Sequence, residues 1–413
     1  MVGERIRLLR LARGMSLDDL ADKMGGIVSK QAISKYERCL SQPSQKVMVG
    51  LAQALEVKTS SLWTKPRIGV EFIAYRKGSG LVKSEQDRIR SVITEALENW
   101  TELQELMGGS LSFNVPVRSQ KINRLEDTEA VAEKVRQKWE LGVGPIASVT
   151  GTMEEHNVFV VEVISQEGFD GISAVARDES QKVKAAAVVS RQGISGERQR
   201  LNLVHELGHL LLDVPSTIDE EKAAFRFGAA FLAPSKLLFK EIGEKRSSID
   251  LKELILLKKK FGLSMQAIIY RLKDLGVINQ SYCRGWFTFI NSRGWKKVEP
   301  EELAPERPQW LQRSVLRAFA EKVITSEKAE QLLGGAFECA KQESSSLVRR
   351  RSFMRLSLQE RKRILSEQAN KYSTSYEPDT DWMEMQGGIG DGSGEEHFKF
   401  GRCAKRRYLV HGT

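Results

Sequence analysis

One five-residue motif constrains this chain more than any other feature: His205-Glu206-Leu207-Gly208-His209. In a helix, residues four apart lie on the same face, so the two imidazoles can bind one metal ion. The glutamate between them can accept a proton from a water whose pKa zinc lowers to about 7. The motif therefore predicts a metal site in which His205 and His209 are ligands and Glu206 is the general base.

The alternative is a chance match, with two helix histidines satisfied inside an ordinary core. The flanks of the motif argue against this, because the expected helix over 198–212 is apolar nearly all round and would be buried. Two imidazoles and a carboxylate are costly to bury unless something pairs with them. A bound metal ion would pair with all three groups, so we favour the metal site.

A catalytic zinc site needs a third protein ligand and an open position for water. The next expected helix, at about 219–232, offers Glu220 and Glu221. The helix face that continues from Glu221 carries Ala224 and Gly228, and such small residues would let this helix approach the first one closely. Glu220 also shares a face with Ala224, so periodicity alone leaves both glutamates open.

The two helices together resemble the ImmA/IrrE family of metallopeptidases. The resemblance covers RQRLNLVHELGHLLL and then EKAAFRFGAAFLAP, within residues 198–234. The family carries an ExxAxxFA pattern that closes on LLxP; here the pattern falls on Glu221, Ala224, Phe227, Gly228 and Pro234. Gly228 replaces the usual alanine, and Phe225 stands where a polar residue is common. The resemblance implies that Glu221 is the third zinc ligand. Histidine and carboxylate ligands also accept manganese, although zinc is favoured.

A second pattern occupies the N-terminus, which is expected to form short helices. Ser16 should cap one helix, since Asp19 lies three residues on. Ser29 should cap the next helix, in which Ile33 and Tyr36 point inward. The polar residues on the outer face would then be free to contact the major groove of DNA. The expected DNA-contacting residues are Ser29, Lys30, Gln31, Ser34, Lys35 and Arg38.

Each of these side chains suits a particular contact. Gln31 can bind adenine through two hydrogen bonds, and lysines and serines can bind bases or phosphates. Arg38 lies at the helix end and is expected at a phosphate. Over about 60 residues, including the run QAISKYE, the segment resembles the XRE (Cro and lambda-repressor-like) helix-turn-helix family. It departs at Leu17, where glutamine is common, and in the longer turn GGIVSK. The alternative is a small helical bundle for protein contacts.

The whole chain is expected to be mainly α with a small β-sheet (an α+β fold) whose central domain is zincin-like. Strands are expected at 157–165 and 183–190. The second is either a plain core strand or an edge strand that receives an extended peptide. The expected segments are a helix-turn-helix domain at 1–66, a helical linker at 67–110, the metallopeptidase domain at 111–280, a helical module at 281–345 and a charged, partly disordered tail at 346–413.

Composition indicates which partners and which cellular location to expect for the protein. The net charge of +10 favours a polyanionic partner such as double-stranded DNA. No apolar run approaches the length of a membrane span, and the N-terminus lacks the apolar core of a signal peptide. The four cysteines are scattered and form no CxxC pair, which is typical of reduced thiols. We therefore expect a cytoplasmic protein without a membrane partner.

Taken together, the patterns predict a DNA-binding transcriptional regulator with a zinc endopeptidase domain. The family resemblance implies that its protein substrate is a repressor or an antitoxin-like protein. A homodimer is expected, because this class of DNA-binding domain usually reads two half-sites. The alternative is a non-proteolytic repressor whose metal domain is a sensor or a structural module. The sequence does not select an oxyanion-stabilising residue, although Arg198 and Arg200 lie close to the motif.

Overall fold

The computed structural model of the chain describes residues 2–64, 68–74, 82–108, 115, 117–165, 169–334, 353–354 and 356–373. The chain divides into two units, Met1–Phe337 and Glu338–Thr413. The second unit contributes one described helix, α17 (Leu358–Ser373), and most of the expected charged tail lies outside the described residues. None of the described helices is both long enough and apolar enough to cross a membrane.

Four helices and one short turn of 3-10 helix form the N-terminal domain of the first unit. They are α1 (Val2–Ala12), α2 (Leu17–Lys23), α3 (Lys30–Glu37), α4 (Gln45–Ala54) and η1 (Thr59–Leu62). Ser16 and Asp19 form a reciprocal capping box at the start of α2. The Ser29 hydroxyl accepts the backbone N–H of Ala32. Both expected caps are therefore confirmed, and Ile33 lies fully buried in the core of this domain.

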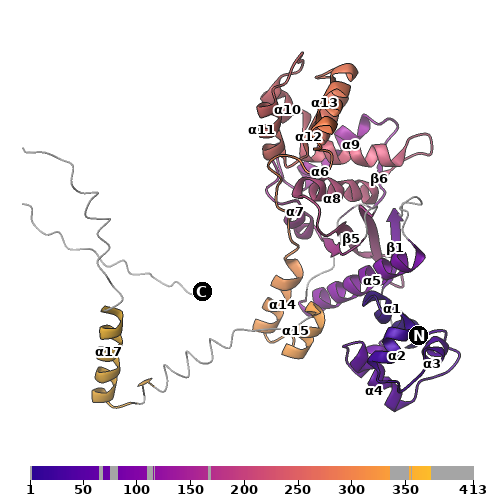
Figure 1. The fold of residues 1–413 in the computed structure, drawn as a ribbon, viewed down its shortest axis with the longest axis vertical. Helices are drawn as coiled ribbons and strands as arrows, with labels where there is room; N and C mark the ends of the chain where they lie inside the picture. Colours follow the sequence, from indigo (N-terminus) through magenta and orange to yellow (C-terminus); the bar gives the residue numbers. More distant parts are fainter. Residues whose placement is uncertain are drawn as a thin grey trace, which may run out of the picture. The chain divides into compact units, whose positions relative to one another are not determined.

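A four-stranded sheet in the order β1–β4–β5–β3 occupies the middle of the first unit (Figure 1). Its strands are β1 (Gly69–Ala74), β3 (Val158–Val163), β4 (Gly171–Arg177) and β5 (Val183–Arg191). β3 and β5 pair in parallel, and the other two pairs are antiparallel. The fold is thus mainly α with a small mixed sheet, and the two expected strands are confirmed as β3 and β5.

β5 is a central strand, so the hypothesis that it is an edge strand open to a peptide is wrong. Its neighbours are β4 and β3, and both of its faces are covered. Ala186 and Val188 pack in the core cluster that also contains Leu203 and Leu207. Ala185, Ala187 and Val189, on the opposite face, pack in a second cluster. The near-continuous apolar sequence of this strand reflects burial on two sides.

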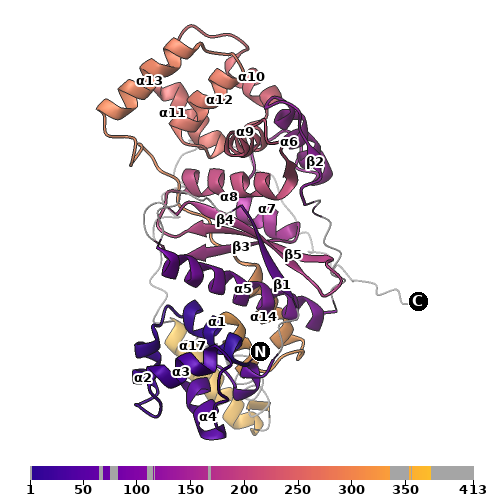
Figure 2. The ribbon, with the colours of Figure 1, turned by 90° about the vertical axis from the view of Figure 1, so that its right-hand side faces the viewer.

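The helix that covers the second face of the sheet is α5 (Lys83–Leu106). Its residues Ile89, Ile93 and Leu97 are buried in one cluster with Ala185, Ala187 and Val189 of β5. Figure 2 shows α5 below the sheet and α8 above it. In the span 67–110, expected to be a helical linker, the described residues include the strand β1 and this covering helix. The boundaries of the five expected segments stay a prediction.

Helices fill the layer on the other face of the sheet. They include α6 (Asp127–Lys138), α7 (Val149–Glu155), α8 (Gly196–Leu211) and α9 (Glu220–Leu232), followed by α10 (Ser235–Ile242), α11 (Leu251–Phe261), α12 (Met265–Asp274) and α13 (Gln280–Ser292). The short parallel pair β2 (Gln120–Lys121) and β6 (Leu212–Asp213) follows the end of α8. The remaining helices, α14 (Trp310–Ala320) and α15 (Ser326–Leu333), share an apolar cluster with Leu103 of α5.

An extended segment between α13 and α14 is bonded to the start of α8. The Leu303 N–H donates to Glu197 (2.9 Å), and its carbonyl accepts the Gly196 N–H (2.8 Å). Glu306 accepts the Thr150 N–H (2.7 Å) and forms a buried ion pair with Arg200. The helix α8, which carries the histidine motif, therefore packs against the sheet on one side and is hydrogen-bonded to this segment on another.

Candidate metal centre

The three sequence-predicted metal ligands meet between α8 and α9. His205 and His209 are both 3% exposed, and their Nε2 atoms lie 3.1 Å apart. Glu221 Oε2 lies 3.4 Å from His205 Nε2, and Glu221 Oε1 lies 3.5 Å from His209 Nε2. Within the described residues, this is the group of histidine, cysteine and acidic side chains whose geometry suits a metal ion.

These distances fit zinc. Ligand bonds of 2.0–2.1 Å in a tetrahedral site place neighbouring donor atoms about 3.3 Å apart. The two imidazole nitrogens lie 3.1 Å apart, and each lies 3.4 or 3.5 Å from one oxygen of the Glu221 carboxylate, which is close to that spacing. Two imidazoles and a carboxylate are also a ligand set of catalytic zinc sites, in which the fourth position stays open. The residues present therefore fit the ion that the sequence predicted.

Small residues bring the two helices together, as the sequence indicated. A Cβ added at Gly208 would lie 3.2 Å from Cα of Ala224 and 3.1 Å from the Phe227 ring. A Cβ at Gly228 would lie 3.4 Å from the His205 backbone nitrogen, which is ordinary contact. The close approach at Gly208 is what places the Glu221 carboxylate within reach of both imidazoles.

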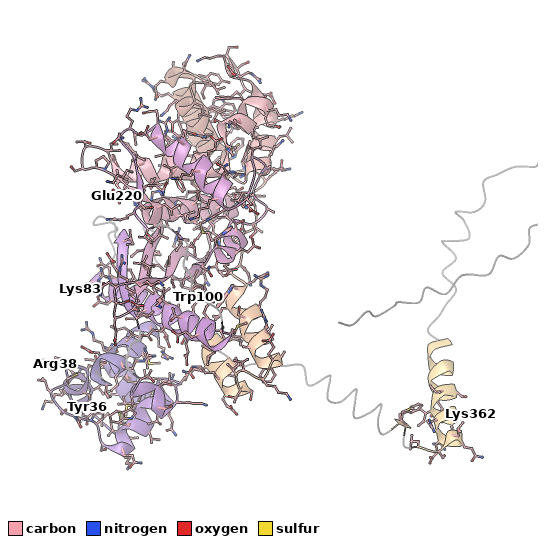
Figure 3. All side chains as sticks on the ribbon, turned by 180° about the vertical axis from the view of Figure 1, so that it is seen from behind. Tyr36, Arg38, Lys83, Trp100, Glu220 and Lys362 are labelled. Atoms are coloured by element: carbon pink, nitrogen blue, oxygen red, sulfur yellow. The ribbon has the colours of Figure 1, made fainter. Side chains whose placement is uncertain are left out.

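Glu220, the second glutamate that periodicity left open, has a different place. Its Oε1 lies 3.5 Å from His209 Nδ1, the ring nitrogen that faces away from Glu221. A carboxylate that accepts a hydrogen bond from Nδ1 would keep the proton on that nitrogen and leave the Nε2 lone pair for a metal. Glu221 thus lies where a third ligand would be needed, and Glu220 lies beside the outer nitrogen of His209. Figure 3 labels Glu220 on the helical layer above the sheet.

Arg118 lies next to Glu220, and sequence reasoning missed it. Its guanidinium lies 3.3 Å from Glu220 Oε1 and donates to the carbonyl of Ile73, at 3.1 Å. Ile73 belongs to the edge strand β1, so this contact ties the end of β1 to the metal centre. Arg118 stands in a loop with a positive φ of 44° and belongs to no motif, so no local signal could have found it.

The expected general base, Glu206, lies 6% exposed on the sheet side of α8. A Cβ added at Gly171, the first residue of β4, would lie 2.8 Å from Glu206 Oε1 and 3.0 Å from the Val189 carbonyl. Only a glycine leaves room there for the carboxylate. The position of Gly171 therefore explains why the strand begins with this residue type.

The pocket is rich in negative charge. Burial pushes the pKa of His209 down, but the carboxylates of Glu221, Glu206 and Glu220 outweigh burial and leave this pKa raised above its usual 6.5. Without a metal, the site thus favours a proton on His209. Three carboxylates around two buried imidazoles form a place that needs a cation, in agreement with the metal-ligand geometry.

The two arginines near the motif are engaged elsewhere. Arg200 is 7% exposed; it pairs with Glu306 and donates to the carbonyl of Ile146 at 2.7 Å. Arg198 pairs with Asp170 at 2.7 Å. Both contacts lie at the N-terminal half of α8, and the oxyanion-stabilising residue stays unassigned.

The residues expected to contact DNA lie on and beside α3. Ser29, Lys30, Gln31, Lys35 and Arg38 are exposed and Ser34 is half-buried. Ser29 also caps the helix, and Lys30 forms an exposed ion pair with Asp18 at 3.0 Å. Figure 3 shows Arg38 at the outer edge of the N-terminal domain. The structure therefore leaves this polar surface accessible.

Comparisons with known families agree with both parts of this description. Residues 6–62 match the helix-turn-helix family model, and residues 188–273 match the peptidase model described as the IrrE N-terminal-like domain. The second match begins within β5, includes both ligand-bearing helices and ends in α12. No curated protein matches the chain. The chain thus joins a DNA-binding helix-turn-helix domain of the XRE type to an IrrE-like domain of the metallopeptidase type.

Proposed function

We propose that this protein is a transcriptional regulator whose zinc-dependent endopeptidase domain hydrolyses a peptide bond in a protein partner, namely a repressor or an antitoxin-like protein. The proposal is carried by the closeness of the donor groups: His205 Nε2 and His209 Nε2 lie 3.1 Å apart, and each lies 3.4–3.5 Å from an oxygen of the Glu221 carboxylate, beside the buried carboxylate of Glu206. We place this activity in the cytoplasm, where the DNA partner would be found.

The residues divide the chemistry between them. Zinc held by His205, His209 and Glu221 would supply a Lewis acid for the substrate carbonyl and the attacking water. Glu206 takes the proton from that water and returns it to the leaving amine. Gly171 leaves the space that the Glu206 carboxylate occupies. Burial of both imidazoles excludes bulk water from the ligand side.

An extended substrate would pair with β1. Within the described residues β1 pairs with β4 alone, and the proposal assigns its other edge to the substrate by strand addition. The end of this strand lies at the metal centre, because Arg118 contacts both the Ile73 carbonyl and Glu220. Main-chain hydrogen bonds along β1 would therefore guide a peptide toward Glu206 without selecting its sequence.

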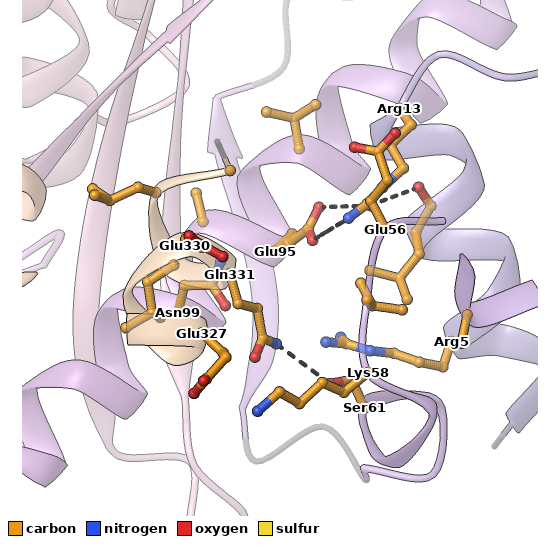
Figure 4. A pocket seen from close by; sticks show the side chains of 18 of the residues that line it. Arg5, Arg13, Glu56, Lys58, Ser61, Glu95, Asn99, Glu327, Glu330 and Gln331 are labelled. Carbon is orange, nitrogen blue, oxygen red and sulfur yellow. Dashed lines mark hydrogen bonds and ion pairs between the residues drawn. The ribbon is translucent and has the colours of Figure 1, made fainter. Parts of the chain in front are cut away.

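The DNA-binding domain is held against the peptidase domain with its α3 surface free. Arg13 of α1 pairs with Glu95 of α5 at 3.4 Å, and Arg5 pairs with Glu98. A cavity of about 790 Å³ lies beside this contact, and Gln331 of α15 crosses it to bond with Ser61 (Figure 4). We propose that the protein binds double-stranded DNA as a homodimer while the peptidase domain stays attached.

The proteolytic part is tested by comparing the proteins of cells that express the wild type with those of cells that express Glu206→Gln. Mass spectrometry of new N-termini should reveal cleavage in a repressor or antitoxin with the wild type and none with the variant. Zinc content should be equal in both purified chains, since Glu206 is not a ligand. Identical sets of N-termini would favour the alternative, a repressor whose metal domain acts as a sensor or structural module.

The DNA-binding part is tested with duplex DNA selected from a random pool by the full-length chain. Gln31→Ala should weaken binding to the selected sequence by about 5–150-fold, which corresponds to the ~1–3 kcal/mol of one lost base contact. Gln53→Ala is the matched control, because Gln53 is an exposed glutamine on α4. Equal losses for the two variants would contradict the assignment of α3.

A further inference from the structure

A shallow groove of about 650 Å³ lies between α13 and the segment that precedes α11. The α13 side contributes Tyr282, Trp286 and Phe289, whose spacing places them on one flank of the helix. The Tyr282 hydroxyl ties the two sides of the groove together, because it accepts the backbone N–H of Ile249 at 2.7 Å. The second family match ends at residue 273, so α13 lies outside both matched ranges.

The aromatic side chains at this groove hold one another in place. The ring of Phe289 packs edge to face against Trp286, with centroids 5.5 Å apart, and against Trp295, at 5.6 Å. Trp286 and Phe289 are half-buried and line the groove with their remaining surface. Gly285 leaves open space beside them, since no atom lies within 4 Å of a Cβ added there. The groove therefore offers aromatic surface to a planar ligand.

The same stretch of the chain is basic. Residues 275–298 contain no aspartate or glutamate, and they carry Arg284, Arg293, Lys296 and Lys297. Within the described residues, Lys296 and Lys297 are exposed and form no ion pair. The Arg293 guanidinium lies over the Phe289 ring, 5.4 Å from its centroid, which places a positive charge at the groove. An anionic ligand would therefore meet cations that no carboxylate neutralises.

The opposite side of the groove does not cancel this charge. Residues 242–253 are neutral overall, because their three acids are matched by three bases: Glu244, Asp250 and Glu253 against Lys245, Arg246 and Lys252. Arg246, which lines the groove, makes two bonds to the carboxylate of Glu253, at 2.9 and 3.0 Å. The exposed hydroxyls of Ser247 and Ser281 also line the groove. The groove thus combines aromatic rings, hydroxyl groups and a positive balance of charge.

We propose that this groove is a second nucleic-acid site, which binds a single-stranded segment of DNA or RNA. Bases stack on Trp286 and Phe289, while Arg293, Lys296 and Lys297 contact the neighbouring phosphates. A polyanion without bases would leave the rings unused, and the bases of a duplex are already stacked on one another. The site is separate from the α3 surface, because α13 lies on the α8 side of the sheet and α3 lies beyond α5 (Figures 1 and 2). It does not depend on the proposed peptidase activity.

Fluorescence anisotropy with the full-length chain and labelled strands of about 12 nucleotides tests the site, since single-strand sites cover ~4–16 nucleotides. The probes are oligothymidylate, oligouridylate and an abasic strand of the same length and charge. A probe with bases should bind at least about fivefold tighter than the abasic strand. Gly285→Glu, which places a carboxylate in the open groove, should abolish this preference. Thr288→Glu is the matched control, because it adds the same charge to an exposed position of α13 outside the groove.

Two further variants locate the phosphate contacts. The double substitution Lys296→Gln and Lys297→Gln should lower the slope of log affinity against log salt concentration by about 1.4, at ~0.7 for each lost contact with a single strand. Lys35→Gln, on α3, should leave the affinity for the single strands unchanged. Circular dichroism shows whether each variant is folded.

The outcomes decide between stacking, charge and the α3 surface. A preference for either base-bearing probe that is lost in Gly285→Glu and kept in Thr288→Glu supports the site, and the tighter probe identifies DNA or RNA as the preferred strand. Equal binding of the abasic strand would refute the stacking of bases and leave a surface for acidic partners. Equal losses in the two glutamate variants, or as large a loss in Lys35→Gln, would refute the location at α13. A wild type that binds none of the probes would overturn the proposal.

Discussion

Gly208 of α8 lies directly against Ala224 of α9, and a methyl group at Gly208 would be packed more tightly than in ordinary van der Waals contact. A Cβ at Gly208 would come within 3.2 Å of the Ala224 Cα. This contact sets the separation of the two helices that carry the metal ligands. It makes the zinc affinity depend on a residue that does not touch the ion.

Gly208→Ala should therefore separate α8 from α9 and weaken zinc binding by tenfold or more. The added methyl group should also destabilise the metal-free protein by about 1–3 kcal/mol, as overpacking of a tight core does. Gly228→Ala is the matched variant, because its Cβ would meet only ordinary contacts of 3.4 Å. It should keep the zinc affinity and gain up to about 1 kcal/mol from helix propensity. Competition with a chelator measures the zinc affinity, and urea denaturation measures the stability of the metal-free protein. Similar results for the two variants would contradict this packing.

Gly171→Ala should retain zinc and lose catalysis. Its methyl group would lie 2.8 Å from Glu206 Oε1, so the carboxylate must leave its place. We expect cleavage of the substrate to fall by about 100-fold or more, the range that a general base contributes. Gly69→Ala, in β1, provides the control because no atom lies within 4 Å of its added Cβ. Normal cleavage by Gly171→Ala would contradict the assignment of Glu206 as the general base.

Removal of the carboxylate at His209 Nδ1 should weaken zinc binding without removing a ligand. We expect Glu220→Ala to lower the affinity by about 10–100-fold, the usual effect of losing an outer partner of a metal-bound histidine. Glu220→Gln can still accept a hydrogen bond and should be intermediate. Glu155→Gln, an exposed glutamate at the end of α7, should have no effect. An affinity of Glu220→Ala equal to wild type would show that Arg118 and Glu220 do not support the site.

The bond between Glu306 and α8 should make stability depend on pH. Burial pushes the pKa of Glu306 up, but the Thr150 N–H and the charge of Arg200 outweigh it and leave the pKa below its usual 4.5. A lowered folded-state pKa means that the charged form contributes stability above pH 4.5, and that this contribution disappears as the pH falls through the lowered value. Glu306→Gln should thus cost about 1–3 kcal/mol at pH 7 and progressively less below pH 4.5.

Urea denaturation of the metal-free chain at several pH values measures this difference. Glu301→Gln is the control, since Glu301 is half exposed in its ion pair with Lys259 and should contribute little at any pH. A constant difference between wild type and Glu306→Gln from pH 7 down to pH 3.5 would contradict the assigned charge of Glu306.

Much of this site could be predicted from local patterns, and the rest depends on contacts between distant segments. Helix periodicity places His205 and His209 on one face, and the family pattern selects Glu221, because both signals lie within one or two helical turns. The edge strand β1 could not be predicted, since its partner β4 lies about a hundred residues away. Arg118 reaches Glu220 from a loop 102 residues earlier. The exposure of Phe225 is likewise a tertiary property, because its helix also carries buried phenylalanines.

The metal content of the purified full-length chain tests the central claim most directly. Elemental analysis of the wild type beside Glu221→Ala, with zinc and manganese both offered, should find about one zinc per wild-type chain and far less in the variant. Circular dichroism should show both chains folded, so that the loss reports the ligand. A folded wild type that takes up no zinc, or a Glu221→Ala variant that holds as much zinc as the wild type, would contradict the three-ligand centre on which the proposed peptidase rests.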